Sequence, residues 1–228
     1  MWDDLFGGQL ESPNTMVLVT AGVALVVVAV SVLWRPARHV ITIVHEAGHA
    51  LVAVLSGRRL AGIRLHSDTS GLTVSRGRPY GPGMVLTGFA GYVAPSLLGL
   101  GFAALLGADR VTGLLVACAL LLFGVLVMVR NVYGVFSVLA TSAVLIGVAY
   151  WATDQVQAAF AHVITWLLLL GGLRSVVELQ SKRRRGQARD SDADQLARLT
   201  GAPGLFWVGI FLLVGLGCLV LAAGWLLG

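Results

Sequence analysis

Long apolar runs constrain this sequence more than any other feature. Of its 228 residues, 57% are hydrophobic and only 12% are charged, a composition outside that of soluble globular domains. A helix needs roughly 20 apolar residues to cross a hydrocarbon core about 30 Å thick. The pattern predicts seven such helices: Met16–Trp34, Ala37–Ser56, Met84–Leu106, Val111–Val129, Val132–Trp151, Ala158–Val177 and Leu205–Leu227. We therefore expect an all-α polytopic membrane protein in which residues 1–228 form one integral membrane domain.

A polar segment at residues 57–83 separates the second and third predicted helices. Its letters LAGIRLHSDTSGLTVSRGRPYGPG alternate apolar and polar residues on either side of Asp68-Thr69-Ser70-Gly71. This pattern is typical of a β-hairpin, with Gly71 expected at the positive-φ position of the turn. Ile63 and Leu65 would share one strand face, and Leu72 and Val74 another. We expect a small cytoplasmic β-hairpin whose edge could hold an extended peptide, or otherwise an ordinary loop.

The basic residues predict the orientation in the membrane. A cytoplasmic N-terminus keeps the arginines of the hairpin, Arg174 and the Lys182–Arg198 stretch inside. Only Arg35, Arg38 and Arg110 would then lie outside, and an odd number of spans puts the C-terminus outside. We expect a bacterial plasma membrane protein whose basic stretch anchors the topology and contacts membrane lipids. Nucleic acid is not expected as a partner, since no soluble fold or interleaved aromatic residues present these charges.

The second polar segment, residues 178–204, is predicted to be a basic cytoplasmic loop containing a short helix. Ser191 followed by Asp194 indicates a capped helix start, and Gly201 before Pro203 indicates its end. Asp192 and Asp194 would then be first-turn acids that complement the helix dipole.

The letters HEAGH at residues 45–49 carry the chemistry. In HExxH, two histidines four residues apart lie on one helix face and can bind one zinc ion, while the adjacent glutamate reaches a water on the metal. His45, Glu46 and His49 lie within a predicted span, where ionisable groups are costly without partners. One zinc ion and its water would satisfy all three, with Glu46 as the general base. The alternative is that the histidines make interhelical hydrogen bonds and Glu46 is neutral or ion-paired.

VHEAGHALVA in an early span, followed by GIRLHSDTSGLTVS, resembles the site-2 protease family of intramembrane zinc metalloproteases, in particular its compact branch without a PDZ domain. The resemblance implies that the HExxH helix lies toward the cytoplasmic side. It also implies that the substrates are transmembrane or membrane-proximal segments of other proteins.

The resemblance further implies a third zinc ligand, an aspartate in an Asn-rich motif that ends in Asp-Gly. This chain has no Asp-Gly; matching from Asn131, the aspartate position holds Leu139. SDADQLARLTG before the last span resembles a segment of the compact branch, which favours Asp192 as the third ligand. Asp194 and Glu178 are the alternatives.

Other polar residues have weaker predictions. Arg130 and Asn131 could bind the substrate backbone or stabilise the oxyanion, or they could simply form a helix-hairpin turn. His39 is expected at the outer interface, His66 on the hairpin surface and His162 in span packing. Cys118 and Cys218 are expected to be small hydrophobic residues.

The sequence therefore predicts a zinc-dependent metalloendopeptidase (HExxH type) that hydrolyses peptide bonds in or near transmembrane segments, consistent with regulated intramembrane proteolysis. The alternative, favoured by the missing Asp-Gly, is a catalytically inactive relative that binds or chaperones membrane proteins.

Overall fold

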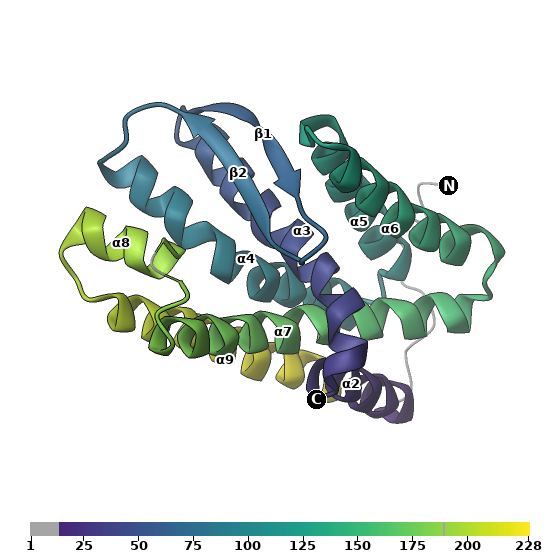
Figure 1. The fold of residues 1–228 in the computed structure, drawn as a ribbon. Coiled ribbons are helices and arrows are strands. Elements are labelled where there is room, and N and C mark those ends of the chain that lie inside the picture. The colour runs from purple at the N-terminus through teal and green to yellow at the C-terminus, as the bar shows by residue number, and fades with distance from the viewer. Residues whose placement is uncertain (1–13, 189) are drawn as a thin grey trace.

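The computed structural model describes residues 14–188 and 190–228, which form helices and one small antiparallel sheet at one side of them (Figure 1). The elements are α2 (Asn14–Ala29), α3 (Ser31–Leu55), β1 (Arg59–Leu65), β2 (Gly71–Arg76), α4 (Pro82–Gly107), α5 (Val111–Met128), α6 (Val132–Trp151), α7 (Asp154–Arg184), α8 (Asp192–Thr200) and α9 (Gly204–Leu227).

The five later membrane helices agree with the sequence prediction. α4, α5, α6, α7 and α9 are each long and apolar enough to span a membrane, and α5 and α6 form the tight hairpin predicted around Arg130 and Asn131. α7 is longer than predicted: it continues past Val177 to Arg184, so Glu178 and the first basic residues of the expected loop lie on this helix.

The first two predicted spans differ from the structure. The helix breaks at Val30, and α2 and α3 meet at 101°. The predicted boundary at Arg35–Pro36 is wrong, and Pro36 lies inside α3. The described residues contain five candidate spans, or six if α2 and α3 form one bent span, so the expected seven are not found.

The bend also corrects the predicted sides of the membrane. Arg38 was expected outside and Glu178 inside, yet the Arg38 Nε atom lies 3.4 Å from Glu178 Oε2. His39, expected at the outer interface, lies 3.2 Å from the hydroxyl of Tyr133 at the start of α6. Because α3 turns away from α2, its first turns lie beside the last part of α7.

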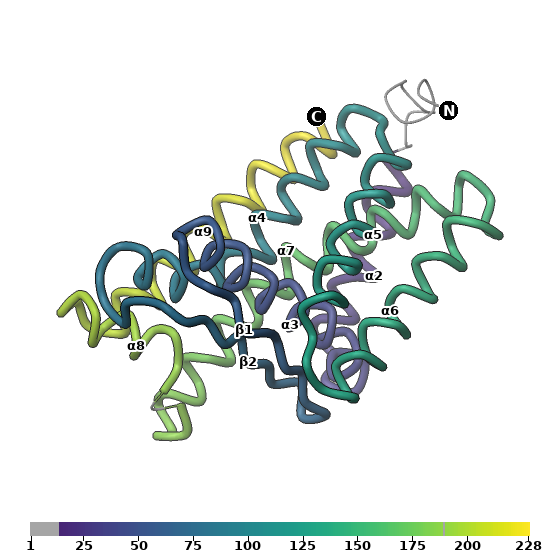
Figure 2. Tube along the Cα trace, turned by 90° about the horizontal axis from the view of Figure 1, so that it is seen from above, coloured from purple at the N-terminus to yellow at the C-terminus, as the bar shows by residue number. Residues whose placement is uncertain are grey.

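α3 packs closely against α4 at the centre of the core. A Cβ built at Gly48 on α3 would lie 2.5 Å from the Cβ of Ala94 on α4, so only glycine lets these backbones approach. Figure 2 shows α8 and α6 at opposite ends of the molecule, with the hairpin beside α3. α4 thus links the HExxH helix to α8, whose Leu196 packs near Gly88.

The hairpin follows the predicted face pattern. Ile63 pairs with Thr73 and Leu65 with Gly71; Ile63 and Leu65 are buried, whereas Leu72 and Val74 are exposed. The turn prediction is wrong, because the positive φ falls on Thr69 (67°) and Gly71 begins β2.

Contacts with α3 hold the hairpin turn. Arg38 donates to the Thr69 hydroxyl at 2.8 Å, and the Thr42 hydroxyl donates to the Thr69 carbonyl at 2.9 Å. These contacts support a backbone conformation that is unfavourable for threonine.

Candidate metal centre

α3 places His45 and His49 one helical turn apart on the same face. Their Nε2 atoms lie 3.0 Å apart, which is the arrangement expected of the HExxH spacing. His49 and the neighbouring Glu46 are buried, with 8% and 4% of their surfaces exposed. The structure thus brings together the three residues of the motif, two of them buried where a polar group needs a partner.

α4 fixes the orientation of the histidine rings. His49 Nδ1 lies 2.6 Å from the Thr87 carbonyl oxygen, and because a carbonyl can only accept, Nδ1 carries the proton and Nε2 is left unprotonated in the neutral ring. The ring of His45 packs edge-on against Tyr92, with centroids 4.8 Å apart. A Cβ at Gly91 would overlap both histidine rings, so glycine is required behind them.

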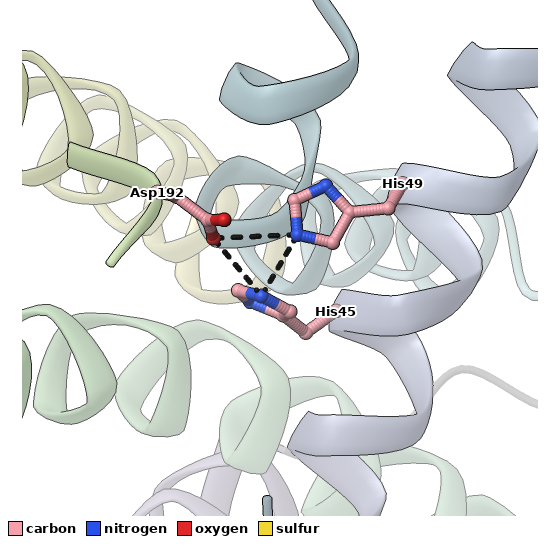
Figure 3. A group of neighbouring side chains, drawn as sticks. All are labelled: His45, His49 and Asp192. Atoms are coloured by element: carbon pink, nitrogen blue, oxygen red, sulfur yellow. Dashed lines mark hydrogen bonds and ion pairs between the residues drawn. The ribbon is translucent and has the colours of Figure 1, made fainter. Parts of the chain in front are cut away.

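α8 supplies the carboxylate that completes the group. Asp192 Oδ2 lies 3.2 Å from His45 Nε2 and 3.3 Å from His49 Nε2 (Figure 3). Burial disfavours the charged carboxylate, but the two imidazoles beside it have the larger combined effect and lower the pKa of Asp192. Among the described residues, this is the group of His, Cys, Asp and Glu side chains able to hold a metal ion.

The start of α8 is held in place by Asp194. Ser191 caps the helix by accepting from the Asp194 backbone N–H at 3.4 Å, and its hydroxyl donates to Asp194 Oδ2 at 2.6 Å. Arg183 at the end of α7 donates to Asp194 Oδ1 at 2.7 Å. The predicted capping role is therefore present in Asp194, while Asp192, at the first helical position, points toward α3.

The distances fit a tetrahedral zinc site. Zinc bonds of about 2.0–2.2 Å at tetrahedral angles place neighbouring ligand atoms roughly 3.2–3.6 Å apart. The three separations here, 3.0, 3.2 and 3.3 Å, are near this range. Two imidazoles and one carboxylate also leave a fourth position for water or substrate, as catalytic zinc sites require.

β2 contacts the side chain of Glu46 directly. The Thr73 hydroxyl donates to Glu46 Oε2 at 2.6 Å and does not bond to Oε1. A Cβ built at Gly71 would lie 2.5 Å from Oε1. The hairpin therefore determines where the glutamate carboxylate can lie.

The other predicted site residues lie outside this group. Glu178 accepts hydrogen bonds from Trp34 Nε1 at 2.7 Å and from Arg174 Nε at 3.1 Å. It also forms an ion pair with Arg38, so its carboxylate is engaged by these neighbours. Asn131 clamps the backbone of Leu65: its Nδ2 donates to the carbonyl at 2.6 Å, and its Oδ1 accepts from the N–H at 3.1 Å.

Arg130, next to Asn131, also bonds to β1, because its backbone N–H donates to the Ile63 carbonyl at 2.9 Å. The remaining histidines and cysteines behave largely as expected. His66 is exposed on the hairpin and His162 is buried, both as predicted. Cys118 and Cys218 are free, with Cys218 buried.

Sequence reasoning missed the partners that position the site. Thr87, Gly91 and Tyr92 lie on α4, and Thr73 lies on β2. The glycines Gly88, Gly91 and Gly99 on α4 are a sequence signal of close helix packing, but nothing in the pattern links them to the histidines.

A profile described as Peptidase M50B-like matches residues 18–222. The chain belongs to this family. The match covers the described helices from α2 into α9 and confirms the resemblance to site-2 proteases. No curated protein and no solved structure matches the chain. The chain is thus an integral membrane protein of a peptidase family.

Proposed function

We propose that this M50B-like protein is a zinc-dependent intramembrane endopeptidase that hydrolyses peptide bonds in or near transmembrane segments. The observation that carries the proposal is the convergence of His45, His49 and Asp192 beside a buried glutamate. These three residues would hold the metal. Zinc bound there would act as a Lewis acid on the scissile carbonyl and would activate a water molecule for attack.

Glu46 is the proposed general base and later acid. Its Oε2 is occupied by the Thr73 hydroxyl, so Oε1 is the atom that takes the proton from the attacking water. The same carboxyl then returns this proton to the leaving amine. Because β2 fixes the carboxylate, little rearrangement is required at the moment of proton transfer.

We further propose that β2 holds the substrate as an added strand. One edge of β1 pairs with β2, and its other edge bonds the backbone at Val129 and Arg130. In the described residues, the second edge of β2 has no strand partner. An extended peptide bonded there would lie beside Glu46, and this mode requires the helical substrate to unwind locally.

Arg130 and Asn131 remain proposed substrate-binding residues. Asn131 uses its amide to clamp Leu65, so we propose that it acts through the hairpin by fixing β1. Substrate bound on β2 would then be aligned by a hairpin anchored at both the α5–α6 turn and α3.

The proposed orientation places the site on the cytoplasmic side, with both ends of the helical region outside. If α2 and α3 are one bent span, six crossings put the start of α2 and the end of α9 on the same side. Among the described residues, Arg110 is then the one Lys or Arg at the outer end of a helix, which satisfies the positive-inside bias better than the seven-span arrangement.

The zinc content of the purified protein and its cleavage of a transmembrane peptide test the function. Wild type should bind about one zinc ion and cleave, whereas Glu46→Gln should keep the metal and lose roughly 100-fold or more in rate. Equal cleavage by both proteins would refute the mechanism. The inactive-relative alternative rested on the missing Asp-Gly motif, and the position of Asp192 beside both histidines supports the active enzyme instead.

A further inference from the structure

Two cavities of opposite character adjoin at Pro36 and His39, near the start of α3. One is polar, with a volume of about 780 Å³, and lies between α3, the hairpin turn and the end of α7. The other is apolar, about 400 Å³, and extends between α3 and the helices α4, α5, α6 and α7. Both volumes fall within the range of small-molecule sites, roughly 300–1,000 Å³.

The polar cavity carries an excess of positive charge. Four cations line it (Arg35, Arg38, Arg174 and Lys182), against the carboxylates Glu178 and Asp68. Glu178 is already bonded to Arg38 and Arg174. Arg35 and Lys182 are exposed and have no ion-pair partner among the residues that the structure describes. The cavity therefore suits a ligand with negative charge.

The apolar cavity suits a hydrocarbon chain. Side chains such as Ile43, Phe136 and Phe160 form its walls, and the hydrogen-bonded pair His39 and Tyr133 lies at the end that meets the polar cavity. Its other end reaches Val144 and Leu145, in the middle of α6. In the proposed orientation, the change from polar to apolar follows the direction from the cytoplasmic surface into the bilayer.

We propose that the two cavities together form a binding site for one anionic phospholipid. Its phosphate would lie among Arg35, Arg38, Arg174 and Lys182, and an acyl chain would occupy the apolar cavity. A soluble anion would use only the first cavity, and a neutral lipid only the second. Because Pro36 and His39 line both cavities, the arrangement favours a molecule that has both parts.

The site also contacts the hairpin that positions Glu46. Arg38 lines the polar cavity and donates to Thr69 at the hairpin turn. A phosphate bound to Arg38 would therefore lie against the same turn. The lipid proposal does not depend on catalysis, so binding measurements can test it even if the proposed peptidase activity fails.

The test uses the purified full chain in detergent and native mass spectrometry with added lipid. Phosphatidylglycerol should bind at least about 10-fold more tightly than phosphatidylcholine with the same acyl chains, and more tightly than glycerol 1-phosphate. The variant Arg35→Gln/Lys182→Gln, which changes two exposed side chains, should weaken phosphatidylglycerol binding by about 30-fold. The matched control Arg76→Gln/Arg184→Gln, with the same charge change outside the cavity, should bind like wild type.

A second variant tests the acyl chain separately. Ala140 lines the apolar cavity and is exposed, so Ala140→Trp should fill the cavity and reduce long-chain phosphatidylglycerol binding while leaving glycerol 1-phosphate binding unchanged. Four results would overturn the proposal. Three are equal binding of the two phospholipids, equal loss in the control variant, and no effect of Ala140→Trp. The fourth is glycerol 1-phosphate binding as tight as that of the lipid, which would identify a soluble-anion site.

Discussion

Replacing Gly71 with alanine should inactivate the enzyme without removing its metal. A Cβ at this position would lie 2.5 Å from Glu46 Oε1, 2.6 Å from Cγ and 2.7 Å from Cδ, roughly 1 Å closer than an ordinary contact. Glu46 cannot move aside freely, because it is buried and its Oε2 is bonded to Thr73. The glutamate, the strand or both must therefore shift by about this amount.

A displacement of about 1 Å at a catalytic group lowers rates by about 100-fold. We expect Gly71→Ala to cleave a transmembrane peptide about 100-fold more slowly than wild type, with zinc content unchanged, because His45, His49 and Asp192 keep their positions. The measurements are single-turnover cleavage in proteoliposomes and zinc content by mass spectrometry. Gly101→Ala is the control, since a Cβ there meets nothing within 4 Å. Cleavage by Gly71→Ala within about threefold of wild type, or a parallel loss of zinc, would refute this account of how Glu46 is held.

Three further predictions follow from other parts of the structure. In a zinc titration, Asp192→Asn should weaken zinc binding by more than the roughly 10- to 100-fold typical of a lost outer-shell partner. The control Asp190→Asn changes an exposed residue two positions away and should leave zinc binding unchanged. Equal effects of the two variants would exclude Asp192 as ligand. Asn131→Ala should lower the free energy of unfolding by about 1–3 kcal/mol in a denaturant titration, because it leaves two buried backbone groups of β1 unpaired; an unchanged value would contradict the clamp. Hydrogen bonds from Ser70 lower the pKa of Asp68 below 3.8, so the contribution of the Asp68 carboxylate to the hairpin turn is present above pH 3.8 and is lost as the pH falls through the lowered pKa. Amide exchange at Ser70 should therefore accelerate in this acidic range in wild type. An identical acid profile in Asp68→Asn would contradict the assignment.

The helices that could be predicted from the sequence were those whose apolar runs are long enough to require a membrane crossing. The break at Val30 could not be predicted, because the residues around it are apolar and include no proline or glycine. Long-range contacts fix the direction of α3 instead, including the hydrogen bond from Trp34 Nε1 to Glu178. Contacts between residues so far apart in the chain leave no periodic signal in the sequence, so the bend and the sides of Arg38 and His39 were predicted incorrectly.

The same holds for the candidate site: residues close together in the sequence were predictable, whereas partners from distant segments were not. His45, Glu46 and His49 were predictable because helix geometry relates their spacing to a shared face. Asp192 lies on a separate helix, and it was favoured only through a resemblance of its segment to relatives. Thr73 and Thr87 were not predicted at all, since a strand threonine and a backbone carbonyl carry no motif of their own.

The division of the site between α3 and α8 has a consequence for biosynthesis. A nascent chain that has emerged only through α6 contains the histidines and the glutamate but lacks the carboxylate of Asp192, which follows α7. Under the proposed mechanism, such a chain cannot complete its metal centre, so proteolytic competence arrives only after α7 and the start of α8 have been made. Newly inserted membrane segments nearby would then be exposed to this enzyme only after its own α8 has been made.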